Sequence, residues 1–321
     1  MKLKMLYSEM RSDLDLIEKE LEIAVNSSSD LLNEASLHLL LAGGKRIRPV
    51  FVLLAAKFGN YQIDQMMNVA VPLELIHMAS LVHDDVIDDS EMRRGQLTVK
   101  AQWNNRVAMY TGDFIFARAL EYITNINNPQ AHRILSYAMV EICVGEIIQI
   151  EDKFRLDQRL QDYFRRIKRK TALLISSSCQ LGAVVSGADE KTATHLKRFG
   201  YYVGMSFQII DDILDITSTD KELGKPAGSD LIQGNITLPI LFLKDSPEFR
   251  PALEHAISGN MTEIERLALV KRIRESDAIP KAKAISNRYL QKALKEIDSL
   301  PASPAKKSLR EIALYMGKRK F

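Results

Sequence analysis

Aspartates gather at two places in the chain, and at both their spacing is that of a metal site. The first cluster lies in LVHDDVIDDSEMRRG, residues 81–95, and contains Asp84, Asp85 and Asp88. Asp84 and Asp88 are four residues apart, so on a helix they point from one face and could share a hard cation. Taken alone, this cluster is better explained as a solvated acidic helix end.

The second cluster, Asp211, Asp212 and Asp215, interrupts the apolar segment FQIIDDILDI. Burying unpaired carboxylates there would cost several kcal/mol each unless a cation or hydrogen bonds compensated. A structural salt bridge is the alternative explanation. Two DDxxD clusters together predict facing walls of one pocket that hold Mg²⁺, which takes one or two carboxylates per ion and prefers phosphate oxygens. The expected metal ligands are Asp84, Asp88 and Asp211.

Basic residues near the turns and the acidic clusters could surround a diphosphate that Mg²⁺ bridges. The candidates are Lys45, Arg48, Arg93, Arg94, Lys170 and Lys225. We expect the basic run from Arg165 to Lys170 to be mostly a solvated face, with Lys170 alone directed to the site. For any single one of these residues a surface position is the simpler explanation, and their shared placement favours function.

Helices must position these residues, because the apolar spacing is helical along the chain, as in Leu14, Ile17 and Leu21. Only 15 glycines and 10 prolines occur in 321 residues, clustered where helices would stop. A long helix from near Tyr61 should end at the first cluster, and another should carry residues 207–216. We predict a single all-α domain over residues 1–321.

Composition excludes several classes of protein. Hydrophobic residues make up 46% and charged residues 26%, and the net charge of +3 gives no field that would recruit nucleic acid. Cys143 and Cys179 lie in helical patterns without metal-ligand spacing, which favours a reduced, cytoplasmic protein. Neither a signal peptide nor a charge-free apolar stretch of about 18 residues is visible, so we expect no transmembrane segment.

The ordered motifs resemble those of the trans-polyprenyl diphosphate synthases over nearly the whole chain. They are GGKRIRP (43–49), ELIHMASLVHDDVIDDSEMRRG (74–95), GDFIFARAL (112–120), KRKTALL (168–174), GMSFQIIDDILD (204–215) and GKPAGSDLIQGNITLP (224–239). The resemblance implies an isoprenoid synthase helical bundle with a central cavity between the two Asp motifs. Within the family, the likeness is to the large catalytic subunits (component II) of bacterial heptaprenyl diphosphate synthases. It therefore implies a C35 product for the menaquinone side chain, and a smaller regulatory subunit that completes a heterodimer.

The resemblance also assigns roles to residues. Its isopentenyl diphosphate site falls on Lys45, Arg48, His77 and Arg94. Its allylic diphosphate site falls on Arg93, Lys170, Thr171, Gln208 and Lys225, with three Mg²⁺ ions. The expected catalytic set is Asp84, Asp85, Asp88, Asp211, Asp212, Asp215, Lys170, Thr171 and Gln208. His77 could instead be a satisfied core histidine. Many relatives carry a lysine where this chain has Asn235, so that lysine's role does not carry over.

Product length should depend on the helix that precedes the first cluster. Ser80, Ile76 and Leu73 share the face of Asp84, at roughly 6, 12 and 16 Å along the helix. Short-chain relatives carry bulky aromatic residues where this chain has Ala79 and Ser80. We therefore expect growth past C20, with Ile76 as the first floor of the cavity, unless Ile76 is plain core packing.

Three other functions are compatible with parts of the pattern. A homodimeric hexaprenyl to octaprenyl diphosphate synthase shares every motif. A class I terpene cyclase has no use for a second diphosphate site, so GGKRIRP and Arg94 count against it. A non-catalytic regulatory subunit would not need both Asp motifs. We expect the lipid product to reach the membrane either with help or through peripheral membrane contact.

Overall fold

The computed structural model describes residues 7–218 and 227–319, which form two compact units. Unit 1 consists of Met1–Met139, Leu174–Gly200 and Ile297–Ile312, and unit 2 of Val140–Leu173, Tyr201–Glu296 and Ala313–Phe321. Each unit is considered separately below. The boundaries of the expected single domain stay a prediction.

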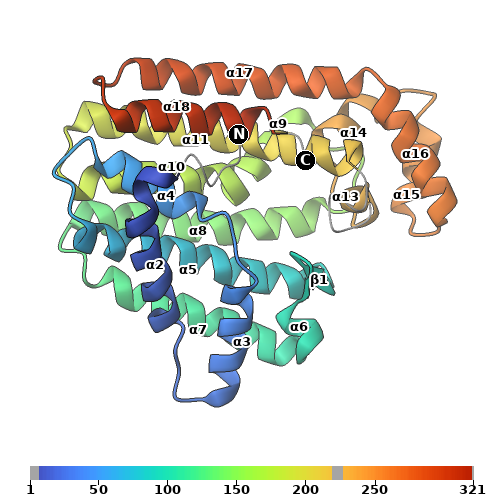
Figure 1. The fold of residues 1–321 in the computed structure, drawn as a ribbon. Coiled ribbons are helices and arrows are strands. Elements are labelled where there is room, and N and C mark those ends of the chain that lie inside the picture. The colour runs from blue at the N-terminus through green and yellow to red at the C-terminus, as the bar shows by residue number, and fades with distance from the viewer. Residues whose placement is uncertain (1–6, 219–226, 320–321) are drawn as a thin grey trace. The chain divides into compact units, whose positions relative to one another are not determined.

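The chain is almost entirely helical, which confirms the all-α fold class (Figure 1). Up to the first Asp motif the helices are η1 (Ser8–Met10), α2 (Arg11–Ala24), α3 (Asp30–Leu41), α4 (Ile47–Ala56) and α5 (Ile63–Ile87). Those that follow are α6 (Val99–Gln102), α7 (Asn105–Ile123), α8 (Pro129–Asp152), α9 (Leu160–Ile167), the π-helix η2 (Lys168–Ala172), α10 (Leu173–Val185) and α11 (Glu190–Thr217). The remaining described helices are α13 (Ser229–Ile232), α14 (Leu238–Leu243), α15 (Arg250–Ile257), α16 (Glu263–Glu275), α17 (Ala278–Asp298) and α18 (Pro304–Gly317).

The core of unit 1 is built around α5, which runs beside α7 and also contacts α4 and α2 (Figure 1). Among the described helices, α5 alone is long and apolar enough to cross a membrane, but 67% of its most apolar window is buried inside the protein. The helix is thus the core helix of its unit. Its last turn carries the first Asp cluster, as the sequence predicts.

A small hairpin follows that cluster and was not expected from the sequence. Strand β1 (Met92–Arg93) pairs antiparallel with β2 (Gln96–Leu97), and Arg94 and Gly95 form the two-residue turn. Both turn residues have left-handed φ values, 54° and 80°, as a type I′ turn requires. This conformation costs a non-glycine residue about 1 kcal/mol, so the surrounding structure must compensate the backbone strain at Arg94.

The core of unit 2 packs apolar side chains of α9, the carboxyl-terminal half of α11, α14 and α16. Tyr163 of α9 is fully buried there, together with Ile209 and Ile213 of α11. The second Asp cluster lies on this half of α11, so its carboxylates are carried by a helix that is fixed in a core.

Candidate active site

The first Asp cluster divides into two kinds of carboxylate. Asp85 is buried, and Arg93 of β1 clamps it with three hydrogen bonds of 2.7 to 3.0 Å. Burial nevertheless raises the pKa of Asp85, with Asp84 and Asp88 adding to the effect and Arg93 opposing it. Asp84 lies in the last turn of α5 and Asp88 directly follows this helix. Both are half-buried, and the backbone amide of Asp88 donates to the carbonyl of Asp84 at 2.8 Å.

The donor set of this cluster fits Mg²⁺. Asp84 and Asp88 supply hard oxygen ligands from one helix turn, and two carboxylates leave coordination positions for water and phosphate oxygens. Within residues 7–218 and 227–319, no three His, Cys, Asp or Glu side chains converge as a closed metal cage would need. An ion held here would therefore be shared with a phosphate.

A cluster of arginines lies in the same unit, and the carboxylates compensate only part of its charge. Arg46 is buried and forms ion pairs with Glu18 of α2 and with Glu74 of α5, the latter at 3.3 Å. By contrast, neither Arg48 nor Arg94 forms an ion pair with a carboxylate in the described part of the chain. The Nε atom of Arg48 is enclosed, and no described atom accepts its proton.

Burial lowers the pKa of Arg48 to about 10, with a further lowering by Arg94 and a partial offset by Glu74. The pKa of Arg94 is also lowered, first by burial and then by Arg46 and Arg93. Two guanidinium groups are thus held close to each other with too little negative charge around them. An anion of two or more charges would satisfy both.

His77 faces the same cationic group from α5. Its pKa is well below the usual value because the ring is desolvated and because Arg48, Arg94 and Arg93 lie near it. A neutral imidazole beside two arginines can accept or donate one hydrogen bond to a bound anion. The surroundings of His77 are therefore polar and cationic, unlike those of a histidine satisfied within an apolar core.

The turn between α3 and α4 completes this corner of unit 1. A Cβ atom on Gly44 would lie 2.9 Å from Nη1 of Arg46 and 3.1 Å from Nη1 of Arg94, so only glycine leaves room for both side chains. Lys45 is exposed beside it. Four of the residues expected for isopentenyl diphosphate, Lys45, Arg48, His77 and Arg94, thus belong to one unit; their role stays a prediction.

The residues expected to set product length lie on the buried length of α5. Leu73, Ile76 and Ala79 are fully buried, and Ser80 is half-buried with its hydroxyl donating to the carbonyl of His77 at 2.8 Å. Each lies on the helix where the periodicity predicts. Their contact with a growing chain stays a prediction.

In unit 2, the three aspartates of the second cluster have different partners. Asp211 is 31% exposed and forms an ion pair with Arg319, whose guanidinium lies 5.2 Å from the ring centre of Phe207. Asp215 is buried and accepts hydrogen bonds from the hydroxyl of Ser229, at 3.1 Å, and from the amide of Asp230, at 3.3 Å. Asp215 thereby fastens the first turn of α13 to α11.

Asp212 is the most enclosed of the three. Its carboxylate accepts a hydrogen bond of 2.6 Å from the hydroxyl of Tyr163 and one of 2.9 Å from the side-chain amide of Gln208. Burial raises its pKa to about 7, Asp230 adds to this, and the two hydrogen bonds oppose it. Hydrogen bonds thus offset part of the desolvation cost that the sequence predicts for this cluster.

The π-helix η2 presents Lys170 and Thr171, at a kind of helical irregularity that is often found at functional sites. Lys170 forms an ion pair of 3.1 Å with Glu146 of α8, and the hydroxyl of Thr171 donates to Gln208 at 2.6 Å. The structure thus brings Lys170, Thr171, Gln208 and Asp212 together in one unit. Lys225 lies outside the described residues.

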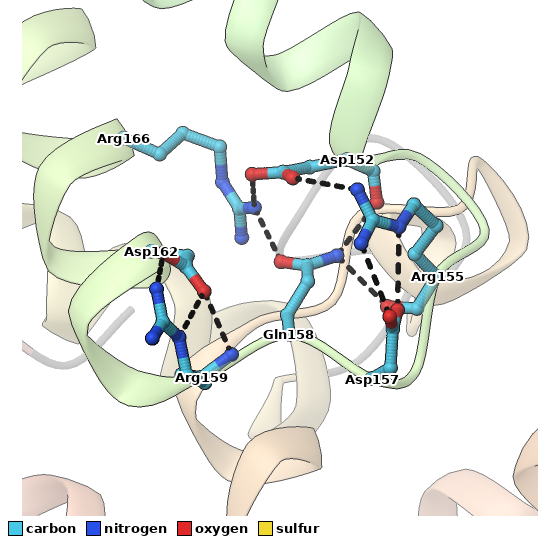
Figure 2. A network of polar contacts seen from close by, with 7 residues as sticks. All are labelled: Asp152, Arg155, Asp157, Gln158, Arg159, Asp162 and Arg166. Carbon is cyan, nitrogen blue, oxygen red and sulfur yellow. Dashed lines mark hydrogen bonds and ion pairs between the residues drawn. The ribbon is translucent and has the colours of Figure 1, made fainter.

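The basic run before η2 differs from expectation. Arg166 is buried, and Figure 2 shows its guanidinium between Asp152 and Gln158, at 3.4 and 2.7 Å. It also donates to the carbonyl of Ile236 at 2.6 Å. Arg169 is half-buried and pairs with Glu141 at 2.9 Å. The expectation of a mostly solvated face was therefore wrong, because carboxylates of α8 and a buried carbonyl of unit 2 accept hydrogen bonds from these cations.

Three residues near the predicted site were not found from the sequence. Tyr163, Arg166 and Arg319 contact the second cluster or the loop beside it from positions outside the quoted Asp motifs. Asn235 is half-buried, and its backbone amide donates to the carbonyl of Asp230 at 2.7 Å. The high amphipathicity of the Arg159–Ile167 segment was the one available signal, since Tyr163, Arg166 and Ile167 share its buried face.

Known proteins are similar to this chain over most of its length. The Polyprenyl synthetase family model matches residues 29–273. The chain belongs to the polyprenyl synthetase family. It is therefore a prenyltransferase that builds long trans-polyprenyl chains, and the family works on diphosphates with Mg²⁺.

Similar proteins include "Heptaprenyl diphosphate synthase component 2" of Bacillus subtilis (strain 168), 58% identical over 100% of this chain and 92% of that protein. The protein of the same name from Geobacillus stearothermophilus is 57% identical over the full length of both chains. Among solved structures, heptaprenyl diphosphate synthase from Staphylococcus aureus has a TM-score of 0.93 and 46% identity, covering 97% of this chain and 98% of its own. A polyprenyl synthase from Caulobacter crescentus CB15, complexed with calcium and isoprenyl diphosphate, has a TM-score of 0.94 and 30% identity, covering 99% of this chain and 98% of its own.

Proposed function

We propose that this polyprenyl synthase condenses isopentenyl diphosphate with an allylic prenyl diphosphate to give all-trans-heptaprenyl diphosphate, C35, for the menaquinone side chain. The observation that carries the proposal is the pair Arg48 and Arg94 with neutral His77, in the same unit as Asp84 and Asp88. One group would bind a diphosphate directly, and the other would bind one through a metal ion. A cyclase needs only the second.

The arginine group would hold isopentenyl diphosphate by its phosphates. Arg48 and Arg94 gain the negative charge that they lack, Lys45 adds a cation at the rim, and His77 contributes a hydrogen bond. Holding this substrate in place converts a bimolecular encounter into a unimolecular step.

Asp84 and Asp88 would hold Mg²⁺ with the allylic diphosphate, as would Asp211, and we propose three ions in all. Bound Mg²⁺ supplies charge stabilisation for the departing diphosphate. Arg93, Lys170 and Lys225 would add hydrogen bonds to the same oxygens. For Lys170 this means leaving Glu146, which holds it at 3.1 Å.

The reaction then runs by ionisation and addition. The C1–O bond of the allylic substrate breaks, and the electron pair leaves with the diphosphate. The π electrons of C3=C4 of isopentenyl diphosphate form a new bond from C4 to C1, which leaves the positive charge on C3. The C2 proton then passes to the released diphosphate, and its bonding pair forms the C2=C3 double bond. The chain contributes preorganised charge; Thr171 and Gln208 would direct oxygen lone pairs to the developing cation.

We also propose a smaller partner subunit. The relatives named component 2 support this, and so does an apolar stripe along α8 at intervals of three and four residues. The stripe consists of Val140, Val144 and Ile147, all in unit 2, which are 60, 39 and 57% exposed. Exposed apolar stripes of this kind are typical of helical interfaces. We place the enzyme in the cytoplasm, with peripheral membrane contact for product release.

Incubation with labelled isopentenyl diphosphate and an allylic primer, with and without the smaller subunit, tests the reaction. We expect label in a C35 product only when both subunits are present. Ile147→Glu should abolish the gain from the partner, whereas Lys191→Glu, at an exposed position of α11, should preserve it. A C35 product made by a homodimer of this chain alone would refute the proposal that a smaller partner subunit is needed.

A further inference from the structure

A continuous chain of hydrogen bonds joins three elements of unit 2 behind Thr171. Tyr163 of α9 donates to Asp212 at 2.6 Å, Gln208 of α11 donates to Asp212 at 2.9 Å, and Thr171 of η2 donates to Gln208 at 2.6 Å. Tyr163 is fully buried, Asp212 is 4% exposed and Thr171 8%. Gly204 lets α11 approach closely, since a Cβ there would lie 2.5 Å from Cα of Ala172.

The direction of these hydrogen bonds is fixed at one end. The hydroxyl of Tyr163 donates to Oδ2 of Asp212 and Nε2 of Gln208 donates to Oδ1, so each carboxylate oxygen accepts one hydrogen bond. The amide nitrogen of Gln208 must then face Asp212, and its oxygen must face Thr171. Thr171 has a single hydroxyl proton, which it donates to Gln208. Toward any other group the Thr171 oxygen can therefore only accept a hydrogen bond or offer a lone pair.

We propose that Asp212 and Tyr163 are positioning residues, which fix the Thr171 hydroxyl so that its lone pairs, and not its proton, meet the carbon that becomes cationic. This inference rests on the proposed function. An oxygen lone pair stabilises developing positive charge, whereas a hydroxyl proton opposes it. In this role Asp212 acts through Gln208, unlike the metal-binding role expected of Asp211 one residue earlier.

The decisive experiment is a double-mutant cycle between Asp212→Asn and Thr171→Val, assayed in the full chain with its partner subunit. An asparagine lets the Gln208 amide turn, so that Thr171 must accept and its proton points outward. Asp212→Asn should lower kcat by about 100-fold and leave the KM of both substrates within about twofold. In the Thr171→Val background the same change should cost less than about threefold, because the hydroxyl it orients is gone. If kcat of the double mutant falls by the product of the two single-mutant factors, the two residues act independently and the proposal is overturned.

Two further variants keep the test independent of folding. Tyr163→Phe removes one donor of the carboxylate and should lower kcat by about tenfold with the KM values unchanged. Ser206→Ala, on the same helix, removes a buried hydrogen bond of 2.8 Å to Ser286. It should lower the melting temperature without changing kcat. Equal kcat in Tyr163→Phe and wild type would contradict the proposal.

Mn²⁺ binding in the presence of inorganic diphosphate, without either substrate, gives a readout apart from catalysis. Asp212→Asn should bind Mn²⁺ with the affinity of the wild type, whereas Asp211→Asn should bind it more weakly. A lower Mn²⁺ affinity in Asp212→Asn would show that Asp212 is a metal ligand and would overturn its positioning role. Wild-type condensation in the same assays separates the two hypotheses. An inactive wild type refutes the proposed function, and an active wild type without coupling between Asp212 and Thr171 refutes only the positioning role.

Discussion

Replacing Arg48 by methionine should make the ligand-free protein more stable and the enzyme worse. The substitution keeps most of the apolar stem and removes a guanidinium whose Nε atom is enclosed and lacks an acceptor among the described residues. A site built to bind an anion holds its charges in place before the anion arrives. The cost of doing so should be measurable.

The size of this cost follows from the pKa of Arg48, which burial lowers from 12.5 to about 10. A tenfold change in an ionisation constant corresponds to about 1.4 kcal/mol, so the charged side chain destabilises the fold by about 3 kcal/mol at most. The residue as a whole is half-buried, and solvent screening reduces this to about 1–2 kcal/mol. At pH 7, below both the folded and the unfolded pKa, the penalty is fully present, so Arg48→Met should remove it.

The expected result is a melting temperature raised by a few degrees in the absence of ligands. The KM for isopentenyl diphosphate should rise by about 100-fold, as the loss of a charged hydrogen bond predicts, while that for the allylic substrate should change less than about threefold. Arg11→Met, at an exposed arginine of α2, is the matched control and should change neither quantity. A lower melting temperature with an unchanged KM would show that Arg48 is a structural cation and refute the reasoning.

Three further predictions concern the metal site and the product. Asp84→Asn and Asp211→Asn should each lower kcat by at least about 100-fold with little loss of stability, because removing a carboxylate weakens Mg²⁺ binding and relieves repulsion; near-normal turnover would exclude the metal role. Ser80→Phe should truncate products to about C15 or C20, while Ile76→Gly should lengthen them at a stability cost of a few kcal/mol. If chromatography shows unchanged product lengths, the floor of the product cavity is formed by other residues. Arg319→Ala removes the ion pair between Arg319 and Asp211 and should tighten Mn²⁺ binding by up to about fivefold, the size of a partly exposed ion pair; weaker binding would mean that Arg319 supports the site.

The sequence predicts the helices that carry the site because periodicity over long segments is a strong signal. The helix that begins near Tyr61 and ends at the first aspartates appears as α5, and the apolar segment around Asp211 lies in α11. Short elements lack this signal. The two-residue strands around Arg94 and the π-helix at Lys168–Ala172 repeat no period, so neither could be expected.

The sequence also does not predict which side chains distant along the chain become hydrogen-bond or ion-pair partners. Asp211 and Asp215 are four residues apart on one helix, but tertiary contacts give them different partners: Arg319 pairs with Asp211, and Ser229 donates to Asp215. The basic run around Arg166 looked solvated because charge counts ignore buried carbonyls such as that of Ile236, which only the fold brings within reach.

The central claim is that this chain supplies two diphosphate sites for one condensation, and labelled isopentenyl diphosphate tests it most directly. The full chain, its partner subunit, an allylic primer and Mg²⁺ should give a C35 product that carries one label for every C5 unit added. A prenyl product without label, or an allylic substrate consumed at the same rate when isopentenyl diphosphate is left out, would contradict the claim.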